Sequence, residues 1–136
     1  MTYTLTTHVQ LPYAEAVEAV RSALKDQGFG VLTEIDIRTT FAAKLGPEAA
    51  TAVGDYVILG ACNPNLASRA LAAEPEMGAL LPCNVVVRRG PDADATTVEA
   101  IDPQTMVQLS SSERVREVAD DAGTRLRAAL AAVAGH

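Results

Sequence analysis

Two cysteines, each followed by an asparagine, are the residues of this chain best suited to chemistry. The first pair is Cys62-Asn63, in the stretch GACNPNLASRAL, and the second is Cys83-Asn84, in LLPCNVVV. Asn is a strong helix N-cap and Pro64 suits the first helical position, so a helix is expected to begin directly after Cys62. The amides and the dipole at a helix N-terminus favour a thiolate. Cys62 is therefore a candidate ligand or nucleophile.

Both thiols also have a simpler interpretation as core residues, because free cysteine is among the most buried residue types. Cys83 in particular begins a Val-rich strand. Whether the two thiols meet depends on sheet topology. They share an edge if the strands Asp55–Cys62 and Val85–Arg89 are antiparallel neighbours, and they lie at opposite ends if a parallel crossover joins these strands. The sequence leaves both arrangements open.

Other potential metal ligands are sparse. The chain has no C-x-x-C and no H-E-x-x-H motif, and His8 and His136 are isolated. Cys62, Cys83 and Met77 would together suit monovalent copper, although a Met in such an apolar context is more often a core residue. The nucleotide motifs GxGxxG and GxxxxGK are also absent, so the sequence identifies no cofactor.

An acidic pair, Glu34 and Asp36, lies on one face at a strand end. If buried, two such carboxylates would act together as acid and base. A structural interpretation competes with this one, because Asp36 is also expected to cap the next helix and Glu34 to be solvated.

Hydrophobic periodicity predicts the elements that must position these residues. Strands are expected at Tyr3–Val9, Gly30–Ile35, Asp55–Cys62, Val85–Arg89 and Thr96–Ile101, the last two as a hairpin. Helices are expected after Pro12 up to Gly28, from Asp36 to Gly46, from Pro64 to before Pro75, and from a Ser110/Glu113 capping box to Gly135, with at most a helical turn over Glu48–Val53. The nearly continuous apolar run of Asp55–Cys62 indicates a strand covered on both faces. The predicted fold class is α+β, a single and mostly antiparallel β-sheet with helices packed on it.

Length and charge restrict the partners. A chain of 136 residues is expected to form one domain, 1–136. Its formal net charge of −6 argues against a nucleic-acid surface and against an anionic membrane. No signal peptide and no apolar run of about 18 residues is recognisable, so a cytoplasmic protein with reduced thiols is expected.

The segments GFGVLTEID, YVILGACNP, ASRALAAEP and MGALLPCNVVV together resemble the domain-of-unknown-function 302 (DUF302) family. The resemblance covers most of the chain and implies a small α+β domain of bacteria and archaea that associates as a homodimer and has no settled activity. The family pattern includes the Cys62-Asn63-Pro64 junction, the Glu74-Pro75 turn and Leu81-Pro82-Cys83, without roles for them. The Ala-rich loop from Pro47 to Asp55 departs from that pattern.

Three hypotheses for function follow. The first is a homodimeric binding protein that holds a small ligand or metal near Cys62, with Asn63, Cys83, Glu34 and Asp36 as the candidate site residues. The second is an enzyme or redox sensor that uses Cys62 as a thiolate. The third is an assembly module that acts only through self-association, for example through the Ala-rich face of the C-terminal helix.

Overall fold

The computed structural model describes residues 2–135, which contain five strands, six α-helices and one 3₁₀ helix. The strands are β1 (Thr4–Val9), β2 (Gly30–Asp36), β3 (Asp55–Cys62), β4 (Cys83–Arg89) and β5 (Thr96–Ile101). The helices are α1 (Tyr13–Asp26), α2 (Ile37–Leu45), α3 (Pro47–Val53), α4 (Pro64–Ala73), the 3₁₀ helix η1 (Pro75–Leu80), α5 (Gln104–Leu109) and α6 (Glu113–Ala134). Within the described residues, no helix has the length and apolar character needed to cross a membrane.

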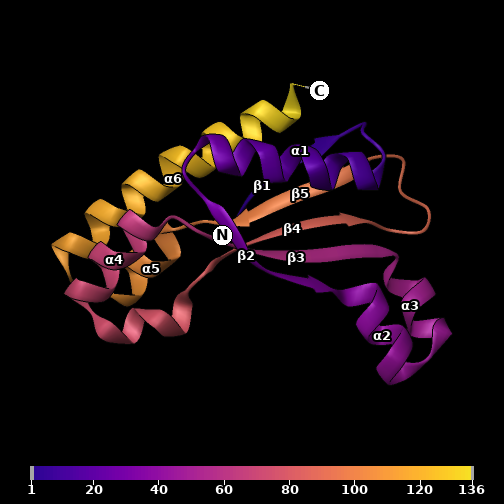
Figure 1. Ribbon diagram of the computed structural model, residues 1–136, viewed down its shortest axis with the longest axis horizontal. Coiled ribbons are helices and arrows are strands. Elements are labelled where there is room, and N and C mark those ends of the chain that lie inside the picture. Colours follow the sequence, from indigo (N-terminus) through magenta and orange to yellow (C-terminus); the bar gives the residue numbers. More distant parts are fainter. Residues whose placement is uncertain (1, 136) are drawn as a thin grey trace.

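The strands form one antiparallel sheet in the order β1-β5-β4-β3-β2. Strands β4 and β5 are the predicted hairpin, and β3 pairs with β4 so that Ala61 lies opposite Cys83. β1 and β2 are the two edges, and α1, which joins them in the chain, runs alongside the strands (Figure 1). The predicted α+β class with an antiparallel sheet is confirmed.

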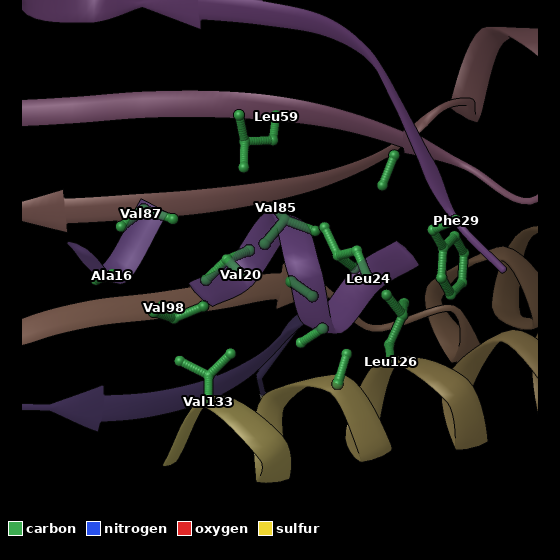
Figure 2. Close-up of a cluster of buried hydrophobic side chains, with 14 of the residues drawn as sticks. Ala16, Val20, Leu24, Phe29, Leu59, Val85, Val87, Val98, Leu126 and Val133 are labelled. Atoms are coloured by element: carbon green, nitrogen blue, oxygen red, sulfur yellow. The ribbon is translucent and has the colours of Figure 1, made fainter. Parts of the chain in front are cut away.

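Helices α1 and α6 cover one face of this sheet (Figure 1). Figure 2 shows Val20 and Leu24 of α1 and Leu126 and Val133 of α6 packed together on the strands. The strand residues beneath them are almost completely buried: Leu59, Val85, Val87 and Val98. Eight residues of α6 are buried, so the apolar face of this helix is used inside the chain rather than presented to a partner.

The residues that start and stop three helices act as the sequence predicts. Asp36 accepts a hydrogen bond from the Thr39 amide at 2.9 Å and caps α2. Asn63 accepts from the Leu66 amide at 3.2 Å and caps α4. Gly28 follows α1 with φ of 84°, a backbone conformation that favours glycine.

The start of α6 differs from the prediction. Its N-cap is Ser112, whose hydroxyl accepts from the Val115 amide at 3.4 Å. Ser110 instead donates to a carboxylate oxygen of Glu74 at 2.5 Å and accepts from the Ser112 amide, and so joins this turn to the end of α4. Ser110 is displaced from the cap because residues 104–109 already form the short helix α5, which has no extended periodic pattern in the sequence.

The prediction that β3 is covered on both faces is wrong. Its inward residues, such as Leu59, are buried under the helices, whereas Tyr56 and Ile58 on the other face are only partly buried. Helices α2 and α3 lie at one end of the sheet, and α4 and α5 lie at the other end (Figure 1). The centre of the second face therefore stays accessible.

Candidate functional site

A broad groove of about 690 Å³ lies on this uncovered face. Its floor is made by outward side chains of β3, β4 and β5, and its walls come from the N-terminal segment, from the end of η1 with the stretch that follows it, and from α5. The lining includes Tyr3, Tyr56, Leu80, Pro82, Asn84, Val86, Arg88, Glu99, Ile101 and Met106. Sites for small organic molecules typically measure about 300–1,000 Å³, so the groove has a suitable size.

The strand register arranges the groove floor in rows. In one row, Glu99 of β5 lies between Thr6 of β1 and Val86 of β4, and Val86 lies opposite Ile58 of β3. In the next row, Arg88 of β4 lies opposite Tyr56 of β3. The floor thus combines apolar side chains with one pair of opposite charges.

Arg88 and Glu99 form that charged pair. Nε of Arg88 donates to a carboxylate oxygen of Glu99 at 2.6 Å, and this hydrogen bond raises the pKa of Arg88. The Glu99 side chain is only 17% exposed, whereas that of Arg88 is 43% exposed. Among the described residues, the pair contact uses Nε alone, so both terminal nitrogens of Arg88 remain available to a ligand.

The two cysteines lie at the end of the sheet beside α4. Because β3 and β4 are antiparallel neighbours, Cys62 follows directly after the Ala61–Cys83 pair, and the thiols share an edge. Both cysteines are free; Cys62 is half-buried and Cys83 is buried. Asn63 is also buried, and its role is to cap α4.

A small apolar cavity of about 30 Å³ lies at this edge. It is lined by both thiols, Met106 of α5, Phe29, and residues of α4 and α6. Burial raises the pKa of the Cys83 thiol to about 11, and the negative charge of an ionised Cys62 contributes to the same shift. Met77 does not line this cavity; it packs with Met106 and Val115 in a neighbouring cluster.

The comparisons with known proteins agree with this structure. The chain matches the family described as "Domain of unknown function DUF302" over residues 5–133. The chain belongs to the DUF302 family. A solved structure, described as that of the uncharacterized conserved protein DUF302 from Bacillus stearothermophilus, shares 27% sequence identity with it. The match covers 97% of this chain and 98% of that chain, with a TM-score of 0.84. None of the curated proteins that were compared matches the chain.

In this DUF302 domain, the acidic candidates Glu34 and Asp36 do not lie beside Cys62. Gly30 is the β2 residue opposite Cys62, whereas Glu34 and Asp36 lie opposite Leu59 and Val57. At about 3.3 Å per strand residue, these carboxylates are about 10 Å and 17 Å further along the sheet. The structure therefore brings Cys62, Asn63 and Cys83 together and separates them from the acidic pair.

Glu34 and Asp36 have partners of their own. Glu34 forms a salt bridge with Arg21 of α1 at 2.7 Å, and Asp36 caps α2. Together with burial, the charges of Asp36, Asp55 and Glu34 raise the pKa of Tyr13 to about 12. Within residues 2–135, no three His, Cys, Asp or Glu side chains are grouped as a metal site.

The groove residues Tyr56, Val86, Arg88 and Glu99 were not among the residues singled out from the sequence. A usable signal is present in the hairpin. Val86 of β4 pairs with Glu99 of β5, and Arg88, two residues beyond Val86, lies on the same face of the sheet as Glu99. The pair was not recognised from the sequence because the apolar run of β3 predicts a sheet buried on both faces. An outward arginine has no evident role in such a sheet.

Proposed function

We propose that this DUF302 domain is a binding protein for a small organic acid with an apolar body, held in the groove on the uncovered sheet face. The observation that carries the proposal is the position of Arg88. Its Nε is fixed by Glu99, and its terminal nitrogens adjoin a groove whose lining includes Val86 and Ile101. A site of this type has apolar walls and few, well-placed polar groups.

The carboxylate of the ligand would bind to the two terminal nitrogens of Arg88. The guanidinium is a planar fork that matches the geometry of a carboxylate, and the bond that Nε makes to Glu99 already restricts its orientation. The Arg88–Glu99 pair is neutral as a whole, so binding adds one negative charge next to an arginine whose pKa is raised. This favours a monocarboxylate over a multiply charged anion.

The apolar body of the ligand would cover side chains that are exposed in the groove walls. Leu80 is 42% exposed and Tyr3 is 68% exposed, and both line the groove. Covering apolar surface contributes about 25 cal/mol per Å² removed from water. Ligands with an aliphatic or aromatic group should therefore bind better than acetate or formate.

A thermal-shift panel of monocarboxylates tests the proposal. A ligand present at 100 times its Kd stabilises the folded protein by about 2.7 kcal/mol, so binders raise the melting temperature. The gain should disappear in Arg88→Met and remain in Arg116→Met, which removes an exposed arginine of α6. The proposal fails if no acid in the panel stabilises the wild type, or if the gain persists in Arg88→Met.

Self-association is proposed at β2, an edge strand of the sheet. Its outer residues Leu32 and Ile35 are 68% and 47% exposed, and an edge strand has free amides and carbonyls that can pair with a second copy. Leu32→Lys with Ile35→Lys should leave a folded monomer, as measured by sedimentation. If the wild type is also a monomer at the same concentration, self-association through β2 is excluded.

Thiol chemistry at Cys62 is the second candidate function, and it suits a cytoplasmic protein with reduced cysteines. Its support is the position of Cys62 directly before the N-cap of the ten-residue helix α4. This candidate requires alkylation of Cys62 at neutral pH to be faster than alkylation of a model thiol, with Cys83→Ser as the background. A rate no faster than the model thiol would exclude it.

A further inference from the structure

We propose that Cys62, Cys83 and Met106 form a binding site for a soft monovalent metal ion, Cu(I). These three sulfur-bearing side chains come from β3, β4 and α5, yet they line one cavity at the end of the sheet. Met106 also lines the groove, but Arg88 and Glu99 do not line this cavity, so the metal site does not depend on the function proposed above.

The fold brings the three residues together through independent contacts. The antiparallel pairing of β3 with β4 places Cys62 next to the Ala61–Cys83 pair. Met106, only 7% exposed, packs with Val115 of α6.

The size of the cavity suits one ion. Its volume of about 30 Å³ is close to the volume that one water molecule occupies in the liquid. A cavity of this size is too small for an organic ligand. The remaining lining is mostly apolar, with Phe29, Leu66 and Val118 among its members. No carboxylate or imidazole of the described residues contributes to this lining, and the side-chain oxygen of Asn63 already accepts from the Leu66 amide, so the lining lacks the set of oxygen ligands that Mg²⁺ and Ca²⁺ prefer.

The chemistry of the ligands points to Cu(I). Thiolates and thioethers are soft ligands that select monovalent copper. Binding would replace the protons of Cys62 and Cys83 and release both to the solvent, which leaves one net negative charge on the bound site. The N-terminus of α4, which begins at Pro64 directly after Asn63, stabilises negative charge at this position.

Met77 provides a matched control. From the sequence, Met77 was a possible third sulfur ligand and, more simply, a core residue. In the structure Met77 is buried beside Met106, and of these two residues only Met106 lines the cavity. Substitution of either Met by Leu removes a thioether from the same apolar cluster at nearly constant volume, which cores tolerate well. The two variants differ mainly in whether the substituted residue lines the cavity together with the two cysteines.

The experiment is an anaerobic titration of the reduced full chain with Cu(I), supplied as its acetonitrile complex, in competition with bicinchoninate. One ion per chain is expected, confirmed by native mass spectrometry. Cys62→Ser and Cys83→Ser should each weaken binding by about 100-fold or more, since loss of even an outer-sphere partner typically costs roughly 10–100-fold. Met106→Leu should weaken it clearly, and Met77→Leu should not change it.

Several results would overturn the site. Equal affinity in Met106→Leu and wild type would mean that two thiols alone capture the ion, without a built site. Unchanged affinity in Cys62→Ser would exclude the site altogether, and this variant is useful even if Cys83→Ser fails to fold, because Cys62 is only half-buried. Arg88→Met should keep its Cu(I) affinity, so failure of the groove proposal and failure of this one are distinguishable.

Discussion

Gly60 shows how a single residue shapes the uncovered face. Residue 60 lies on β3 opposite Asn84, and an added Cβ would meet the hydroxyl of Thr33 and lie 2.9 Å from Cγ of Pro82. We expect Gly60→Ala to lower the free energy of unfolding by about 1–3 kcal/mol, the usual range for overpacking. Urea denaturation measures the change.

Gly30 is the matched control for this substitution. It lies on the neighbouring strand β2, and an added Cβ there meets nothing within 4 Å. Gly30→Ala should be neutral or slightly stabilising, since alanine reduces the freedom of the unfolded chain. Equal destabilisation by both substitutions would show that close contact at Gly60 is not the cause.

The raised pKa of Cys83 makes the stability of the fold depend on pH in the alkaline range. An unfolded Cys83 ionises near its ordinary pKa of 9.0, whereas the buried thiol ionises at about 11. At a pH between these two pKa values, Cys83 has lost its proton in the unfolded chain and retains it in the folded chain. The free energy of unfolding therefore falls as pH rises through this range. The two-unit difference corresponds to about 2–3 kcal/mol.

Denaturation of wild type and Cys83→Ala between pH 8 and 11 tests this dependence. The variant should lose less stability over that range, although it starts from a lower value because of the cavity it creates. Parallel curves for the two proteins would mean that other groups, such as Tyr13 with its pKa of about 12, cause the alkaline loss.

At the scale of single residues, local chemistry could be predicted from the sequence where the partner is near in the chain. Asp36 and Asn63 cap helices that begin at the next residue, so their partners are three positions away. Arg88 could not be recognised in this way. Its partner Glu99 lies across a hairpin, and the role of the pair depends on which face of the sheet remains uncovered.

Among the elements, α2 differs most from the helices of the core. None of its residues is buried, whereas α6 buries eight. Elements with few buried contacts open locally at low free energy. We expect the amides of α2 to exchange with deuterium well before those of the second half of α6, as followed by mass spectrometry at neutral pH.

The cap of α2 refines this prediction. Asp36→Ala removes the side-chain acceptor for the Thr39 amide and should cost about 1 kcal/mol of helix stability, while Asp36→Asn keeps an acceptor. Exchange in α2 should become faster in the alanine variant only, with β3 unchanged. Slow exchange of α2 in the wild type would contradict the view of this helix as a weakly held element.

Element boundaries were predictable where a periodic apolar pattern met a stop residue. Helices α1 and α4 follow such patterns, whereas the bounds of α2 were predicted from its cap Asp36 and from Gly46. Helix α5 and the 3₁₀ helix η1 contain six residues each, which is too short for a repeating pattern. They are held by tertiary contacts instead, with Met77 and Met106 buried against Val115 of α6.

For the whole molecule, the decisive feature is the unequal cover of the sheet. Figure 1 shows α1 and α6 on one side of the strands and the smaller helices at the two ends. The apolar run of β3 predicts cover on both faces, because periodicity within a strand does not report where helices pack. The accessible apolar side chains left by this arrangement, including Val86 and Ile101, form the proposed ligand site.

The most direct measurement of this claim is a titration of isotopically labelled protein with phenylpropionate, followed by methyl and amide NMR. The largest shifts are expected at the outward side chains of β3, β4 and β5, around Val86 and Ile101. Arg88→Met should remove these shifts, and Arg116→Met should not. Shifts centred on another surface, or unchanged in Arg88→Met, would contradict the groove as the binding site of this domain.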